Sequence, residues 1–206
     1  EFMSGDFVDY FAADEHNVLF YIADVSGHGV ASAFVTVYLK RFISANLEHY
    51  RRGSSNRLTD PAAMLAALNG ELLQEKIGKY IALFYAVLNI SSGAITYANA
   101  GAFPWPLLLQ GQQAEYLPLK STPVGMFDFA SYHNSHLQLQ PNSRLLLFSD
   151  GILDLLPQAD NEQKLQYLSD ISQQQPEISS LLQALAITPG QPLPDDLTIL
   201  SLLTPQ

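Results

Sequence analysis

Apolar and polar residues follow two different periods along this chain. Runs of apolar, β-prone residues predict strands over residues 7–13, 18–23, 80–90, 94–98, 107–109, 115–117, 144–148 and 197–203. Apolar residues that recur every three or four positions predict helices over residues 30–50, 61–77, 161–171 and 177–186. Because strands joined by tight turns pair antiparallel, the pattern predicts a mostly antiparallel β architecture with two pairs of helices.

One short segment connects a predicted strand to a predicted helix and carries candidate chemistry. Residues 22–29 read I-A-D-V-S-G-H-G. The strand places Asp24 at its end, and Gly27 and Gly29 allow the backbone to turn before the helix begins. A carboxylate in such a turn suits a metal or phosphate site, and a plain strand-turn-helix corner with a surface aspartate is the alternative.

Aspartates also stand at the boundaries of other predicted strands. They are Asp6 and Asp9 in the first strand, Asp150 in a Ser-Asp-Gly sequence, and the adjacent Asp195 and Asp196 before the last strand. An antiparallel hairpin sets the start of its first strand beside the end of its second, so we expect Asp6 and Asp9 to converge with Asp24. Grouped carboxylates raise one another's pKa unless a cation lies between them. Their hard oxygen atoms favour Mg²⁺ or Mn²⁺ over zinc.

Carboxylates and water alone support metal-assisted hydrolysis. Two cations about 3.5–4 Å apart can lower the pKa of a water molecule, hold it in line with a phosphoester and screen the phosphate charge. This chemistry needs no protein nucleophile, and we interpret Ser26 as a small turn residue because the sequence shows no His-Asp partnership for it. The five histidines form no zinc-binding pattern.

Composition excludes several other classes of function. The 206 residues suffice for one domain with a sizeable core, and 48% of them are hydrophobic. A formal net charge of −10 argues against binding to nucleic acid or to an anionic membrane surface. The absence of cysteine removes disulfides and every thiolate mechanism. No apolar run approaches the roughly 20 residues that span a bilayer, so we expect a cytoplasmic protein.

Six motifs follow one another in a characteristic order. They are S-G-D-F-V-D-Y-F (4–11), D-V-S-G-H-G-V-A-S-A (24–33), Y-A-N-A-G (97–101), T-P-V-G (122–125), L-L-L-F-S-D-G-I-L-D (145–154) and D-D-L-T-I-L (195–200). Together they resemble the SpoIIE-type bacterial branch of the metal-dependent PPM (protein phosphatase 2C-like) serine/threonine phosphatases. The resemblance implies an α+β fold, a four-layer α-β-β-α sandwich with two central antiparallel sheets. It also implies a centre of two Mn²⁺ or Mg²⁺ ions that hydrolyses phosphoserine or phosphothreonine.

The resemblance assigns metal ligands residue by residue. Asp24 corresponds to the ligand that bridges both metals, and the backbone carbonyl of Val25 to a further ligand. Asp6 stands in the family's first acidic motif and would bind one metal directly or through water. Asp150 and Asp195 would complete the shell of that metal.

Three more residues receive supporting roles from the same resemblance. Asp9 and Asp196 would orient ligands or waters around the metals. His28 would donate a proton to the leaving oxygen, although the turn in this branch differs from the better-known D-G-x-x-G form. The chain departs from the family pattern at Val8, where tyrosine is usual, and at 102–104, where the usual histidine is absent. Neither change removes an expected ligand.

The resemblance also implies a place in signalling. Residues 4–206 are expected to form one phosphatase domain, the C-terminal fragment of a response-regulator-like protein with an upstream receiver or sensor domain, and residues 1–3 a cloning remnant. The expected substrate is a phosphorylated anti-anti-sigma (STAS-type) protein of a partner-switching system, and a homodimer is possible. The alternative is an inactive phosphatase-like adaptor that binds a sigma-factor regulator.

Overall fold

The computed structural model describes residues 6–27, 29–188 and 190–204. The chain forms two compact units whose segments alternate along the sequence. Unit 1 runs through Ala102 and resumes over Leu119–Leu139, and unit 2 comprises Phe103–Pro118 and the chain from Gln140 onward. The backbone therefore passes from one unit to the other after residues 102, 118 and 139.

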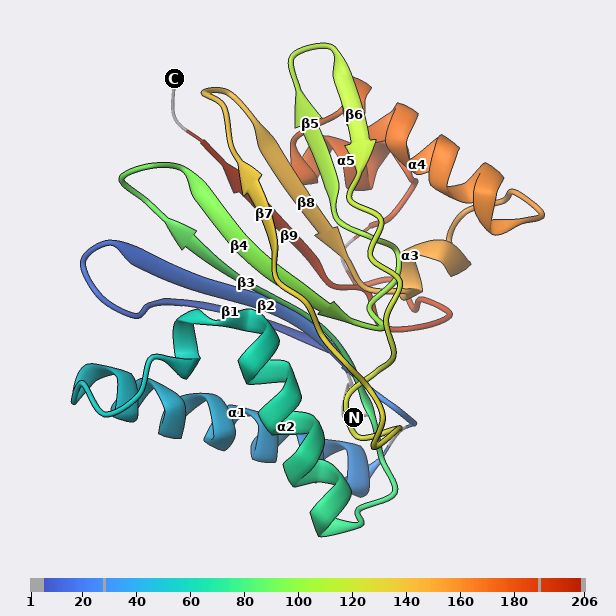
Figure 1. The fold of residues 1–206 in the computed structure, drawn as a ribbon. Helices are drawn as coiled ribbons and strands as arrows, with labels where there is room; N and C mark the ends of the chain where they lie inside the picture. The colour runs from blue at the N-terminus through green and yellow to red at the C-terminus, as the bar shows by residue number, and fades with distance from the viewer. Residues whose placement is uncertain (1–5, 28, 189, 205–206) are drawn as a thin grey trace. The chain divides into compact units, whose positions relative to one another are not determined.

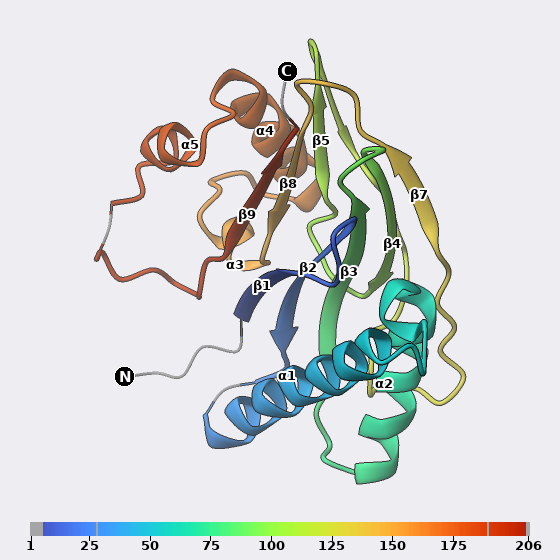
Figure 2. The ribbon, with the colours of Figure 1, turned by 90° about the vertical axis from the view of Figure 1, so that its left-hand side faces the viewer.

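Unit 1 contains a five-stranded antiparallel sheet with the strand order β1-β2-β3-β4-β7. Its strands are β1 (Asp6–Ala12), β2 (Asn17–Val25), β3 (Ile81–Asn89), β4 (Ala94–Ala100) and β7 (Ser135–Gln138). Its helices are α1 (Val30–Arg51), the short 3-10 helix η1 (Arg57–Thr59) and α2 (Pro61–Glu75). Figures 1 and 2 show α1 and α2 side by side on one face of this sheet.

Residues of β2 alternate between the two faces of that sheet. Leu19, Tyr21 and Ala23 are buried in one apolar cluster with residues of α1 and α2. Phe20 and Ile22 point to the opposite face and are buried as well, at 3% and 5% exposure. The long apolar run of β2 therefore reflects a strand that is covered on both faces.

Unit 2 contains a four-stranded antiparallel sheet with the strand order β6-β5-β8-β9. Its elements are β5 (Leu107–Gln110), β6 (Gln113–Tyr116), β8 (Arg144–Phe148), α3 (Gly151–Asp154), α4 (Asn161–Gln174), α5 (Ile178–Ala184) and β9 (Ile199–Leu203). Leu146 and Phe148 of β8 share an apolar core with Ile152, Leu168 and Leu181 from the three helices. Each unit thus consists of one sheet layer and one helix layer.

The predicted α+β class is confirmed. The described residues form two antiparallel sheets and five α-helices, and each unit supplies two of the four layers that the resemblance implies. Most boundaries agree with the sequence pattern within two residues, and Asp60 caps α2 by accepting a hydrogen bond from the Ala63 amide. The helix η1 was not predicted. Among the described helices, none is both long and apolar enough to span a membrane.

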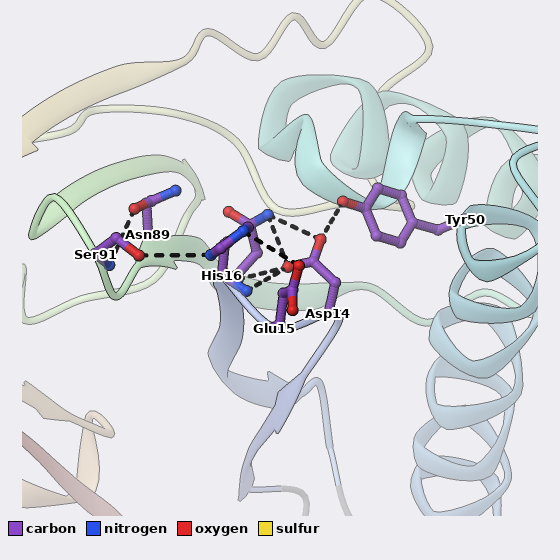
Figure 3. A network of polar contacts seen from close by, with 7 residues as sticks. Asp14, Glu15, His16, Tyr50, Asn89 and Ser91 are labelled. Atoms are coloured by element: carbon purple, nitrogen blue, oxygen red, sulfur yellow. Dashed lines mark hydrogen bonds and ion pairs between the residues drawn. The ribbon is translucent and has the colours of Figure 1, made fainter.

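A polar network fixes the end of the β1-β2 hairpin where its two strands are connected (Figure 3). The Asp14 carboxylate accepts hydrogen bonds from the Tyr50 hydroxyl of α1 at 2.5 Å and from the amides of His16 and Asn17. The His16 ring in turn lies 3.5 Å from the hydroxyl of Ser91 in the β3-β4 turn. These contacts bind the hairpin to a helix and to a neighbouring turn, and so hold its strands in register.

Candidate metal centre

Two of the predicted ligands face each other across the open end of the β1-β2 hairpin. Asp6 pairs directly with Asp24 in the antiparallel register. Side chains of directly opposed residues leave the same face of a sheet. That face is the one opposite α1 and α2, because Ala23 and Val25, the neighbours of Asp24, belong to the core on the helix side. Both aspartates are half-buried.

The chemistry of this pair suits a divalent cation. Like charges on directly opposed residues destabilise a sheet, and a cation between the carboxylates removes that repulsion. The pair offers carboxylate oxygen atoms, which are the ligands that Mg²⁺ and Mn²⁺ prefer. Asp6 and Asp24 therefore fit the implied metal chemistry.

The turn after Asp24 is held by hydrogen bonds to the start of β3. The Ser26 amide donates to the Tyr80 carbonyl at 2.9 Å, and the Ser26 hydroxyl accepts from the Tyr80 amide at 3.0 Å. The Ser32 hydroxyl of α1 donates to the Ser26 carbonyl at 3.2 Å. Gly27 then adopts a φ of +76°, which favours glycine. Ser26 thus has the turn role that the sequence predicted.

The T-P-V-G motif (122–125) packs against the start of β3, the segment to which the Asp24 turn is bonded. Val124 exchanges two backbone hydrogen bonds with Ile81 of β3, at 2.9 and 3.0 Å. A Cβ at Gly125 would lie 2.9 Å from the Lys79 carbonyl oxygen, so only glycine allows this approach. The Gly125 amide donates to the Asn69 side chain of α2 at 2.7 Å. The motif therefore serves to fix the start of β3.

The Y-A-N-A-G motif packs against the same segment. A Cβ at Gly101 would lie 2.7 Å from the Pro123 ring. The buried Asn99 side chain donates to the carbonyls of Ala102 and Leu119, both at 3.0 Å. None of these three contacts was predicted from the sequence. Two of them join residues that lie far apart in unit 1, and the contact of Asn99 with Ala102 spans an irregular turn.

In unit 2, the Ser-Asp-Gly turn after β8 packs against the D-D-L-T segment before β9. The Ser149 amide donates to the Thr198 carbonyl, and the Thr198 amide donates to the Ser149 hydroxyl, both at 2.9 Å. A side chain at Gly151 would overlap the backbone carbonyl of Asp196. This close approach explains the glycine of the turn.

That packing brings Asp150 and Asp195 within electrostatic reach of each other. Desolvation by the surrounding protein atoms and then the negative charge of Asp195 raise the pKa of Asp150 above its ordinary value. Asp195 also accepts a hydrogen bond from the Asp196 amide at 2.8 Å. A cation bound to Asp150 would oppose both effects, so this pair also fits the implied chemistry.

The remaining predicted site residues have different surroundings. Asp9 pairs with Tyr21 and lies on the helix-facing side of the sheet, where it accepts hydrogen bonds from the Tyr21 hydroxyl and the Tyr10 amide. The structure therefore does not bring Asp9 to the Asp6–Asp24 pair. The Val25 side chain is buried, while the role of its carbonyl stays a prediction. His28 and residues 1–3 lie outside the described residues.

Comparison with known proteins identifies the family. The sequence pattern of the family described as Stage II sporulation protein E (SpoIIE) matches residues 14–205 and so extends through both units. The chain belongs to the SpoIIE family. One SpoIIE-type relative is the phosphoserine phosphatase RsbP of Bacillus subtilis (strain 168), which is 30% identical over 157 residues. That match covers 74% of this chain and 37% of RsbP, so the chain corresponds to less than half of that relative.

Solved structures share the fold of this SpoIIE-family chain. The SiaA-PP2C domain of Pseudomonas aeruginosa aligns with a TM-score of 0.76 at 22% identity, over 97% of this chain and 80% of that domain. RsbX, solved in complex with magnesium, aligns with a TM-score of 0.68 at 16% identity, over 98% of this chain and 88% of RsbX. At these identities the likeness establishes the PPM-like fold alone.

Proposed function

We propose that this SpoIIE-family chain is a phosphatase domain that uses Mn²⁺ or Mg²⁺ to hydrolyse phosphoserine or phosphothreonine on a regulatory protein. The observation that carries the proposal is the direct opposition of Asp6 and Asp24 at the open end of the β1-β2 hairpin. The relative RsbP is a phosphoserine phosphatase, which supports the proposed reaction. The structure of RsbX in complex with magnesium supports the proposed cofactor.

The proposed ligand set follows the family resemblance. Asp24 would be a ligand to both ions, the Val25 carbonyl would be a further ligand, and Asp6, Asp150 and Asp195 would complete the set. When bound, the ions supply Lewis-acid activation of water and of the phosphoryl oxygens. The two described pairs, Asp6 with Asp24 and Asp150 with Asp195, each hold like charges together and so support cation binding.

The protein's own residues position the reacting groups. The hydrogen bonds between Ser26 and Tyr80 hold the backbone that follows Asp24, so that the carboxylate stays at the end of β2. In unit 2, the contact of Gly151 with Asp196 holds Asp150 beside Asp195. Rigid backbone of this kind keeps catalytic groups in place without a cost of reorganisation during the reaction.

Other parts of the proposal rest on the resemblance. Asp196 orients ligands or waters, and this role does not extend to Asp9, because the side chain of Asp9 leaves the face of the sheet opposite Asp24. His28 donates a proton to the leaving seryl oxygen. The substrate is a phosphorylated anti-anti-sigma (STAS-type) protein of a partner-switching pathway. An upstream receiver or sensor domain controls activity in a cytoplasmic protein, which can form a homodimer.

The test compares Asp24→Asn with Asp128→Asn, a matched removal of one exposed carboxylate from unit 1. Release of phosphate from p-nitrophenyl phosphate and from a phosphoserine protein is measured with Mn²⁺ and with Mg²⁺. We expect Asp24→Asn to lose at least about 10- to 100-fold in kcat/KM, because removing even a group that only supports a metal ligand commonly costs that much, and Asp128→Asn to match wild type. Wild-type rates in Asp24→Asn would refute the proposal.

A further inference from the structure

Lys79 is the basic residue whose ammonium group lies against the Asp24 turn. Lys79 precedes β3, and its Nζ atom lies 2.5 Å from the position that a Cβ would take on Gly27. Gly27 follows Asp24 by three residues in the D-V-S-G-H-G motif. The φ of +76° favours glycine at this position, and the absence of a side chain leaves room for the ammonium group beside the turn.

The backbone that carries Lys79 is held from both sides. On one side, the next residue, Tyr80, is bonded through its amide and its carbonyl to Ser26. On the other side, the Lys79 carbonyl lies against Gly125 of the T-P-V-G motif. Because these contacts fix the Cα of Lys79, its side chain can reach the Gly27 turn at a small entropic cost.

Lys79 is half-buried in a protein of net charge −10. Over the described parts of the chain, no carboxylate lies within ion-pair distance of its ammonium group, whereas Arg52 and Arg144 pair with Glu48 and Glu177. A half-buried cation without an acidic partner among the described residues retains hydrogen-bonding capacity for an anion. It lies next to the turn that holds a proposed metal ligand.

We propose that Lys79 is a substrate-binding residue whose ammonium group contacts the phosphoryl oxygens of the phosphoserine. This inference rests on the proposed function, which supplies the phosphate ester as the anion. Lys79 would bind the phosphoryl group together with the ions and hold it beside the Asp24 turn. A different role is to balance the charge of the carboxylates of Asp6 and Asp24, and the two roles predict different results.

The experiment uses Lys79→Gln, the charge-retaining Lys79→Arg, and Lys76→Gln as a control that removes an exposed lysine from the same loop. Binding of inorganic phosphate to the Mg²⁺-loaded protein and binding of Mg²⁺ alone are measured by calorimetry. Steady-state kinetics with p-nitrophenyl phosphate give KM and kcat separately. Thermal melting and circular dichroism establish that each variant is folded.

We expect Lys79→Gln to weaken phosphate binding and to lower kcat/KM by about 10- to 100-fold, the effect of losing a hydrogen bond between charged groups. Mg²⁺ affinity should not fall, Lys79→Arg should recover most of the loss, and Lys76→Gln should match wild type. Unchanged phosphate binding in Lys79→Gln with tighter Mg²⁺ binding would overturn the inference in favour of charge balance. If the wild-type protein binds phosphate but hydrolyses no ester, the proposed function fails. Phosphate binding to Lys79→Gln, measured by calorimetry, still decides whether Lys79 contacts the phosphoryl group.

Discussion

Replacing Gly151 with alanine tests how tightly the aspartate-bearing turn of unit 2 is packed. The backbone of Gly151 begins the helix α3, and its φ is not in the left-handed region, so alanine itself is compatible with the local conformation. The added methyl group would overlap the carbonyl oxygen of Asp196 and lie 3.0 Å from its carbonyl carbon. Any loss of stability therefore comes from this contact and not from local backbone strain.

The size of the effect follows from the hydrogen bonds beside the contact. A carbon and a carbonyl oxygen that are not bonded to each other lie at about 3.3 Å or more, so the Asp196 carbonyl oxygen, which the new Cβ would overlap, has to retreat by more than about 1 Å. That movement strains the two bonds between Ser149 and Thr198, each 2.9 Å long. Overpacking at about 1–2 kcal/mol, together with strain that removes about half of the roughly 1 kcal/mol of each hydrogen bond, gives a loss of about 2–3 kcal/mol in the free energy of unfolding. The melting temperature should fall by roughly 5–10 °C.

The assay is urea and thermal unfolding of Gly151→Ala beside Gly70→Ala. Gly70 lies in α2, and a Cβ there meets nothing within 4 Å. Alanine at this open helical position should stabilise the protein by about 0.5–1 kcal/mol. The two changes are chemically identical and opposite in expected sign. If Gly151→Ala were as stable as wild type, the close packing of the Ser-Asp-Gly turn on the D-D-L-T segment would be refuted.

Two other predictions concern charges outside the candidate site. Arg144 is buried at 8% exposure and pairs with Glu177, so Glu177→Ala, which leaves the buried guanidinium without its carboxylate, should cost about 3 kcal/mol in urea unfolding, whereas Glu48→Ala in the exposed pair with Arg52 should cost under about 0.5 kcal/mol, and equal losses would contradict this. Hydrogen bonds from Tyr50, Asn17 and His16 lower the pKa of Asp14. The destabilisation caused by Asp14→Asn should therefore be present at pH 7 and should decrease as the pH falls below about 4. A destabilisation that is independent of pH would exclude this explanation.

Local patterns in the sequence were sufficient to predict the Asp6–Asp24 pair, whereas grouping Asp150 with Asp195 depended on the family resemblance. The β1-β2 hairpin brings Asp6 opposite Asp24 because two apolar runs flank a short polar turn, and this arrangement depends on neighbouring residues only. The position of Asp9 could also have been inferred from the sequence, since residues three apart on a strand point to opposite faces. The expectation that Asp9 converges with Asp24 was therefore wrong, because Asp9 lies three residues after Asp6 on the same strand.

Contacts between distant segments were beyond the reach of sequence patterns. Gly125 and Gly151 look like ordinary turn glycines, yet each is required by a backbone carbonyl from a segment far away in the chain. The same holds for Lys79, whose position over Gly27 depends on how the loop before β3 packs. A pattern of residue types identifies candidate ligands, whereas the residues that hold them in place depend on packing between segments.

The alternation of the two units along the chain has a genetic consequence. Because the backbone passes between them after residues 102, 118 and 139, no single break point in the gene separates the coding sequence of unit 1 from that of unit 2. A single crossover between related genes within this stretch would therefore mix parts of both units. Domain shuffling by one exchange at either end can transfer this region only as a whole, with Asp6, Asp24, Asp150 and Asp195 inherited together.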